Sequence, residues 1–181
     1  LKDGEFRYHD YPVNQMFGVQ SSVPDLMMNM HPLKTKTNAK DYIKRLQAIP
    51  KKFDQVLEGL KIREEKGIVP PNFTIKHVIN EMEDFIAQPA EENPLYSIFT
   101  EKLTEAGLAN LADFQQKVKA EITTSVYPAY QKLIDYFKTL EPKHQENNGV
   151  WALPEGDAYY AQCLRSHTTT TLTPQEVHDI G

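Results

Sequence analysis

The sequence predicts a mainly α-helical protein, an antiparallel multi-helix bundle with an irregular N-terminal arm and little or no β-structure. The first observation is that apolar residues recur at the helical spacing i, i+3, i+4 and i+7 through residues 37–142. The second is that proline or glycine closes each of these runs. Short connections of this kind favour antiparallel helices that pack as a bundle. Alternation with a period of two residues, which is typical of strands, is confined to residues 150–153.

Length and composition indicate a single helical domain. We divide the 181 residues into an arm at 1–36, a bundle at 37–142 and a tail at 149–181. The net charge of -5 argues against a protein that binds nucleic acid, because a duplex binder carries a basic face. No apolar run approaches the ~18 residues that a membrane span needs. The single cysteine, Cys163, excludes an internal disulfide.

The N-terminal arm shows no helical or strand period over any useful length. We expect one turn of helix between Pro24 and Met30 and irregular chain elsewhere. Proline and glycine interrupt the arm repeatedly, at Pro12, Gly18, Pro24 and Pro32.

The first bundle helices follow from apolar spacing and from their caps. Asn38 is the expected N-cap of a helix that Pro50 ends or turns. A second run extends to Gly67, and Thr74 is the expected N-cap of the next helix. The apolar stripe of that helix comprises Ile75, Val78, Ile79, Met82, Phe85 and Ile86.

The spacing of apolar residues over 109–140 predicts one long helix with a kink. A shorter helix that starts at Leu95 precedes it. Pro128 removes one backbone hydrogen bond from the long helix, so we expect the kink between Thr124 and Pro128. The hydroxyl groups able to bond the freed backbone belong to Thr123, Thr124 and Ser125.

The last residues of the tail carry the sequence signal for the N-terminus of a helix. Thr173 is a good N-cap, Pro174 suits the first helical position, and Glu176 completes a capping box. The helix that follows is cut after about two turns, which is marginal for a helix alone. We therefore expect the chain to be a segment of a longer protein and to expose apolar surface where the remainder packs.

Candidate binding residues gather on a second tail helix, which ends near His167. Tyr159 and Cys163 share one face of it, and Tyr160 lies on the neighbouring face. These tyrosines can pack into the core or present hydroxyl groups to a cleft. Arg165 can hold a carboxylate through two parallel hydrogen bonds, or form only a surface ion pair.

Catalytic chemistry has little support in the residues themselves. No two of the six histidines stand four residues apart, as a pair of zinc ligands on a helix would. Cys163 and His167 have that spacing, as a thiolate and its base would, but a small buried thiol is the alternative. We assign no catalytic residue and no metal ligand to this chain.

The tail resembles the bacterial domain-of-unknown-function family 885. The resemblance rests on GVWALPEGDAYY at 149–160, Leu164-Arg165, Thr168-Thr169-Thr170 and residues 172–181. Shorter similar pieces occur earlier, at 11–15, 42–46, 67–71 and 126–130.

The resemblance implies a function for the longer protein. Family members are longer than this chain and resemble helical, zincin-like zinc metallopeptidases, with a His-Glu-x-x-His-type motif in their later part. Many carry an envelope-targeting or lipoprotein leader, which implies the periplasm or cell envelope. The cofactor implied for the longer protein is zinc. The residues implied to lie at the substrate cleft are Tyr159, Tyr160, Arg165 and Thr169.

Two interpretations follow from these expectations. In the first, the chain is the N-terminal helical portion of a metal-dependent peptidase; it is inactive alone and supplies one wall of a peptide-binding cleft. Hydrolysis would then use a metal-activated water with a carboxylate as general base. In the second, the chain is a non-enzymatic binding module of the bacterial cell envelope. The expected partners are the remainder of the longer chain and a peptide. An enzyme that depends on Cys163 is kept as a control hypothesis.

Overall fold

The computed structural model describes residues 4–108, 111–144 and 148–181, and within these ranges it contains no β-strand. The α-helices are α1 (Val19–Asp25), α2 (Lys36–Glu65), α3 (Asn72–Ala87), α4 (Pro94–Glu105), α5 (Leu111–Glu121), α6 (Tyr127–Leu140), α7 (Gly156–Thr168) and α8 (Pro174–Ile180). The π-helical segments are η1 (Leu26–Met30) and η2 (Ile122–Val126), and the 3-10 turns are η3 (Glu141–Lys143) and η4 (Val150–Ala152).

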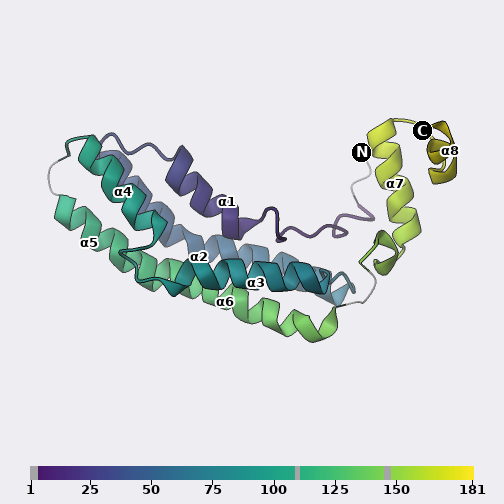
Figure 1. Cartoon of the computed structure of the whole chain (residues 1–181), viewed down its shortest axis with the longest axis horizontal. Helices are drawn as coiled ribbons and strands as arrows, with labels where there is room; N and C mark the ends of the chain where they lie inside the picture. Colours follow the sequence, from purple (N-terminus) through teal and green to yellow (C-terminus); the bar gives the residue numbers. More distant parts are fainter. Residues whose placement is uncertain (1–3, 109–110, 145–147) are drawn as a thin grey trace.

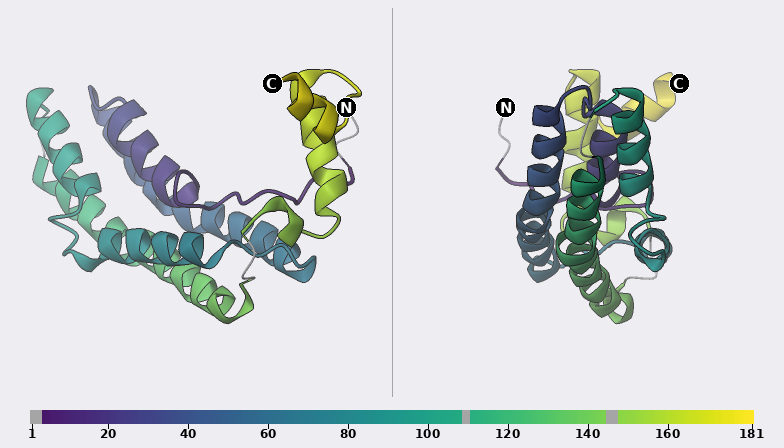
Figure 2. Two further views of the ribbon diagram at one scale, coloured as in Figure 1. Left: turned by 45° about the vertical axis from the view of Figure 1, so that its right-hand side comes forward. Right: turned by 90° about the vertical axis from the view of Figure 1, so that its left-hand side faces the viewer.

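Helices α1 to α6 form an antiparallel bundle along the long axis of the molecule (Figure 1). Helix α2 returns along α1 and η1, α3 and α4 run back, and α5, η2 and α6 return again (Figures 1 and 2). Helix α3 packs along α6, α2 packs against α5, η2 and α6, and α4 packs against α5. The prediction of an antiparallel helical bundle is therefore confirmed.

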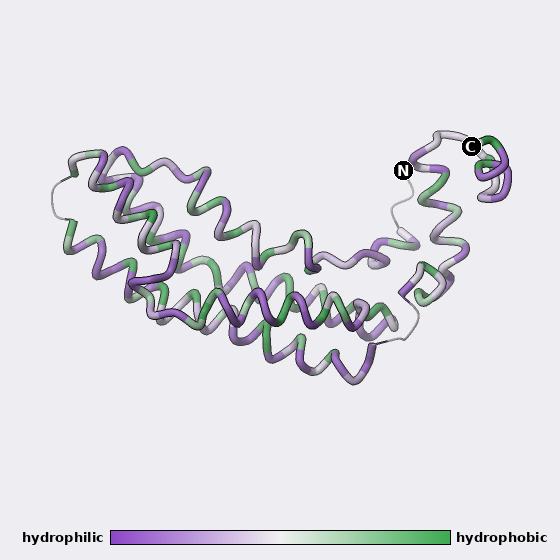
Figure 3. The backbone as a smooth tube through the Cα atoms, in the orientation of Figure 1, coloured by the Kyte–Doolittle hydropathy of each residue, from purple (hydrophilic) through white to green (hydrophobic). Residues whose placement is uncertain are grey.

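The core lies between these helices, and hydrophobic and hydrophilic residues alternate along each of them (Figure 3). Two buried tyrosines satisfy their hydroxyl groups by donating to backbone carbonyls. The Tyr42 hydroxyl lies 2.8 Å from the Leu95 carbonyl oxygen, and the Tyr130 hydroxyl lies 2.6 Å from that of Gln20. The second bond ties α6 to α1. Because a buried hydroxyl without a partner is costly, these bonds allow large polar-tipped rings inside the core.

The N-terminal arm is irregular from residue 4 to Gly18, and then contains more helix than the sequence predicted. Helix α1 and η1 together extend from Val19 to Met30, with Pro24 inside α1. The arm also contributes to the core, because Val13 is fully buried. Tertiary packing against α2 and α4 thus supports a helix that local spacing does not show.

Helix α2 does not end or turn at Pro50, and this expectation was wrong. The helix runs unbroken through Pro50, and its N-cap is Thr35, whose side chain accepts from the amide of Asn38. An interior proline costs about 3 kcal/mol. Apolar side chains before and after Pro50 are buried in the core, among them Leu46, Ile49 and Phe53, and their burial offsets that cost.

Thr74 is not an N-cap either. Helix α3 begins at Asn72, after Pro71, and Thr74 lies buried within its first turn. The Thr74 hydroxyl donates to the side-chain oxygen of Gln15 at 3.0 Å, so it holds the arm against α3. The predicted stripe of α3 is buried or partly buried along its length.

The long helix is confirmed over the described part of 109–140, with a π-helical segment near the predicted kink; residues 109 and 110 lie outside the described residues. Helices α5 and α6 join through the π-helical turn η2, which ends two residues before Pro128. The hydroxyl groups of Thr123 and Thr124 donate to backbone carbonyls four residues back, at 3.1 and 2.8 Å. Ser125 instead donates to the Glu121 carboxylate at 2.7 Å.

The tail leaves the bundle and forms a separate corner of the molecule. Residues 150–153, the only stretch with strand-like alternation, form the 3-10 turn η4 followed by Leu153. Helix α7 stands at one end of the bundle, across its long axis, and α8 follows it (Figures 1 and 2). The capping box of α8 is present as predicted from Thr173 and Glu176.

Candidate functional site

A groove of about 340 Å³ lies between the N-terminal arm and helix α7. Its volume falls within the range of small-ligand sites, about 300–1,000 Å³. Its walls combine an aromatic surface with hydrogen-bonding side chains, which suits a ligand with both apolar and polar parts. The lining residues are Phe6, Arg7, Tyr159, Gln162, Cys163, Ser166 and His167.

The arm holds α7 through a ring cluster and one hydrogen bond. The Nε2 atom of His9 lies 2.8 Å from the carbonyl oxygen of Pro154. Because that carbonyl can only accept, Nε2 carries the proton of a neutral His9 ring. The ring centroid of His9 is 5.1 Å from that of Tyr159, and Phe6 lies 5.6 Å from Tyr159. Arm and helix therefore form the two sides of the groove as one packed unit.

The turn before α7 sets the direction in which this helix leaves η4. Glu155 adopts the left-handed conformation, with φ of 52°, directly before Gly156 begins the helix. A Cβ atom on Gly156 would lie 2.2 Å from the carbonyl oxygen of Val150. Only glycine therefore allows this close approach of η4 to the start of α7.

The predicted binding residues of α7 are not brought together. Tyr159 lines the groove, whereas Tyr160 is exposed and does not line it. Arg165 is also exposed, on a part of α7 outside the groove lining. Thr169 is the C-cap of α7, in the left-handed conformation with φ of 55°. A substrate-binding role for each of the four stays a prediction, and the groove favours Tyr159.

Cys163 and His167 both line the groove, but they do not form a thiol–imidazole hydrogen bond through Nδ1. The Nδ1 atom of His167 lies 2.8 Å from the backbone carbonyl oxygen of Cys163. The Cys163 side chain instead lies close to that of Tyr159, and both line the groove. Burial, followed by the neighbouring Cys163 side chain, raises the pKa of Tyr159 to about 12, so its phenol stays protonated at neutral pH.

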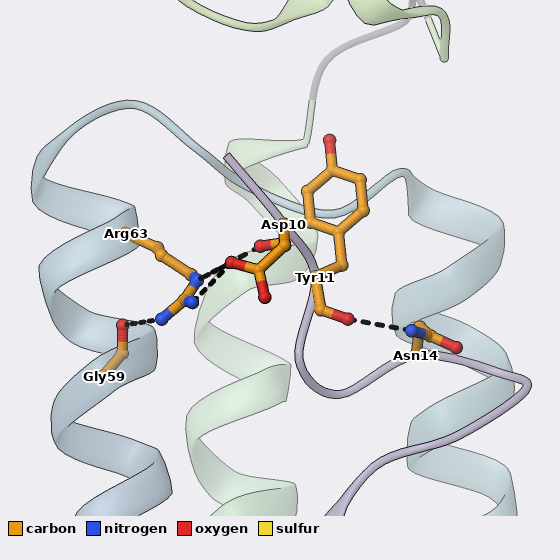
Figure 4. A network of polar contacts seen from close by, with 5 residues as sticks. All are labelled: Asp10, Tyr11, Asn14, Gly59 and Arg63. Atoms are coloured by element: carbon orange, nitrogen blue, oxygen red, sulfur yellow. Dashed lines mark hydrogen bonds and ion pairs between the residues drawn. The ribbon is translucent and has the colours of Figure 1, made fainter. Parts of the chain in front are cut away.

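The arm is anchored to the bundle by an arginine of α2. The Arg63 guanidinium donates from Nε to the backbone oxygen of Asp10 at 3.1 Å and forms an ion pair with the Asp10 carboxylate. Figure 4 shows this contact, together with the bonds from Arg63 to Gly59 and from Asn14 to Tyr11. Arg63 is thereby fixed beside the groove-forming arm.

A cluster of cations surrounds the ring of Tyr8. The charged groups of Arg7, Arg63 and Lys66 lie 5.5, 5.2 and 5.7 Å from the ring centroid, within the range of cation–π attraction. Within the described residues, Arg63 has a carboxylate partner, and neither Arg7 nor Lys66 has one at ion-pair distance. Three cationic side chains therefore approach one ring, and the Asp10 carboxylate pairs with one of them.

The arm side of the groove was missed by the sequence analysis. Phe6 and Arg7 meet α7 across about 150 residues of intervening chain, and no short spacing signals such a contact. Gln162 and Ser166 could have been found, because they lie three residues from Tyr159 and Cys163 on the same helical face.

The described residues do not fit the zinc implied by the resemblance. Over 4–108, 111–144 and 148–181 no group of three or more His, Cys, Asp or Glu side chains could hold a metal ion. The ligands of such a zinc would have to come from elsewhere in a longer protein. No helix in the described part of the chain is long and apolar enough to span a membrane.

The family described as "Bacterial protein of unknown function (DUF885)" matches residues 2–181. The chain is similar to the crystal structure of "the putative lipoprotein from Colwellia psychrerythraea", with a TM-score of 0.87 and 28% sequence identity. The similarity covers 94% of this chain and 30% of that chain, so this chain spans less than a third of the length of that protein. A comparison with curated proteins found no match.

Proposed function

Since this chain belongs to the DUF885 family of bacterial proteins, we propose that it forms one wall of a peptide-binding groove in a longer, metal-dependent peptidase. The observation that supports this role is the groove between Phe6 and Arg7 on the arm and Tyr159 on α7. The metal and the hydrolytic residues belong to the rest of the longer protein. The residues of this chain bind and orient the substrate.

The groove offers what an extended peptide requires. The Phe6 and Tyr159 rings provide an apolar surface for a side chain, and Gln162 provides both a donor and an acceptor for a peptide group. Ser166 adds a hydroxyl on the same wall. Because the arm and α7 are already packed together, little ordering entropy is lost when a ligand binds.

Peptide hydrolysis by the longer protein tests this proposal. A mixed peptide library is incubated with the longer protein, with and without a chelator, and with this chain alone. We expect cleavage by the longer protein, loss of cleavage with the chelator, and none from this chain. Cleavage that the chelator leaves intact would contradict metal dependence.

Two variants connect the activity to the groove. Tyr159→Phe keeps the ring packing and removes the hydroxyl, so we expect the KM for peptides to rise while the fold is retained. Tyr96→Phe on α4, remote from the groove lining, is the matched control and should leave KM unchanged. Equal KM values for the two variants would argue against a role of the Tyr159 hydroxyl in binding.

A non-enzymatic binding module of the cell envelope is the second candidate. The observation that favours it is the similarity to a Colwellia protein whose description names a lipoprotein. In this case the longer protein binds peptides without cleaving them and fractionates with the envelope. Cleavage of the library, or recovery only from the cytoplasmic fraction, would exclude this candidate.

A further inference from the structure

We infer that the groove selects peptides that present a carboxylate to Arg7, either at the C-terminus or on an acidic side chain. This inference rests on the proposed function, because it names the class of peptide that the groove would take. It goes beyond that function in assigning a specificity-determining residue outside α7.

The charge of the groove lining is the first support. Arg7 is the only Lys, Arg, Asp or Glu among the seven lining residues. Among these described lining residues a cationic ligand would therefore meet Arg7 and no carboxylate, and the Asp10 carboxylate, which acts on Tyr159, is paired with Arg63. A carboxylate would meet a cation, and so the lining favours an anionic ligand group.

The surroundings of Arg7 are the second support. Lys66 and Arg63 approach the same Tyr8 ring, and the Asp10 carboxylate compensates only one of these three charges, that of Arg63. Two cations therefore remain without an ion-pair partner among the described residues. An anionic ligand group would compensate these two charges.

The geometry of the donors is the third support. A guanidinium group can donate two parallel hydrogen bonds to one carboxylate, which gives both strength and orientation. The side chain of Arg7 is exposed and carries no hydrogen bond within the described residues, so it is available to a ligand. The Gln162 amide and the Ser166 hydroxyl can donate from the opposite wall to the adjoining peptide group.

Four peptides of one core sequence, each labelled with the uncharged dye BODIPY, test the inference. They carry a free or an amidated C-terminus, each with a central Glu or Gln. Fluorescence anisotropy measures their binding to the longer protein in the presence of a chelator, so that hydrolysis does not consume the probe. We expect a carboxylate-bearing peptide to bind at least about ten-fold more tightly than the peptide with neither carboxylate. The carboxylate whose presence gives the larger gain in affinity, the C-terminal one or that of the central Glu, is the one that the groove recognises.

Charge variants at Arg7 complete the experiment. Arg7→Gln should abolish the preference for peptides with a carboxylate. Arg7→Lys should retain part of it, because lysine keeps the positive charge but cannot donate two parallel hydrogen bonds from one planar group. Arg45→Gln, at an exposed arginine of α2 outside the groove lining, should behave as the wild type. Circular dichroism checks that each variant folds.

The failures of the two proposals are distinguishable. Equal binding of all four peptides, or a preference that survives Arg7→Gln, overturns the assignment of Arg7 and leaves the peptide groove in place. No binding by any of the peptides contradicts the peptide groove itself and, with it, this inference.

Discussion

The Nε2 atom of His9 lies 2.8 Å from the carbonyl oxygen of Pro154, which is 145 residues further along the chain. This contact joins the first described segment to the turn before α7, and the His9 ring also packs against Tyr159. The groove depends on it, because one wall comes from the arm and the other from α7.

His9→Ala should loosen α7 from the arm. It removes one hydrogen bond and two ring contacts, with Tyr159 on α7 and with Phe6 on the arm, each worth about 0.5–1.5 kcal/mol. We expect faster amide hydrogen exchange in α7 and unchanged exchange in the buried helices of the bundle. His77→Ala, at an exposed histidine on α3, is the control and should change neither. Slow exchange in α7 of the His9→Ala variant would mean that other contacts hold this helix.

Gly156→Ala should disturb the turn that starts α7. The new Cβ atom would lie 2.2 Å from the Val150 carbonyl oxygen, so η4 or the helix must move. We expect a loss of about 1–3 kcal/mol, typical of overpacking. The emission of Trp151, the only tryptophan, should report the change.

Gly4→Ala provides the comparison, because nothing lies within 4 Å of a Cβ atom at that position. Its unfolding midpoint and its emission should match those of the wild type. An unchanged unfolding midpoint for Gly156→Ala as well would show that the turn relaxes without cost.

The stability of the protein should depend on the protonation of Glu64. The hydrogen bond from Lys143, and after it the one from Tyr136, lowers the pKa of Glu64 below its ordinary value of 4.5. A carboxyl group whose pKa is lowered by folding stabilises the folded state above its unfolded pKa. That contribution is lost as the pH falls from about 4.5 through the lower folded value.

Glu64→Gln should therefore flatten the fall in unfolding free energy between pH 6 and pH 3. Urea denaturation at several pH values within this window measures it. Glu58→Gln, at an exposed residue of the same helix, should keep the wild-type slope. Parallel curves for wild type and Glu64→Gln would contradict the assignment.

Pro50→Ala should stabilise α2. Proline offers no amide hydrogen to the Leu46 carbonyl, and alanine would restore that bond while the helix path already exists. We expect a gain of about 1–3 kcal/mol in the free energy of unfolding, measured by denaturant titration. A loss of stability would show that packing of the half-buried proline ring matters more than the missing bond.

Local spacing predicted the parts of the fold that depend on one buried helical face. Ile75, Val78 and Ile79 in α3 are buried as their spacing requires, and Leu95, Phe99 and Leu103 are buried in α4. A repeat of 3.6 residues identifies such faces without any knowledge of the partner.

The errors have a common physical origin in tertiary contacts. Pro50 carries a local cost that only the packing of its neighbours can outweigh. Thr74 lies inside α3, which already begins at Asn72, and its hydroxyl donates to Gln15 of the arm. The same holds for the groove. Tyr159 could be identified from its helical face, whereas Arg7 could not, because its position beside α7 depends on the whole fold.

Six buried side chains of the rod formed by α5, η2 and α6 follow one another at intervals of four residues: Phe114, Val118, Ile122, Val126, Tyr130 and Ile134. In a regular α-helix each such interval overshoots a full circle by about 40°, so the stripe would drift more than half way round the rod. The wider turn at η2, in which the Tyr127 amide bonds to the Ile122 carbonyl, takes up part of that drift. It acts as an inserted residue that keeps the two halves in phase. Deletion of one residue from η2 would rotate α6 against α5 by about 100° and turn its buried face away from α3.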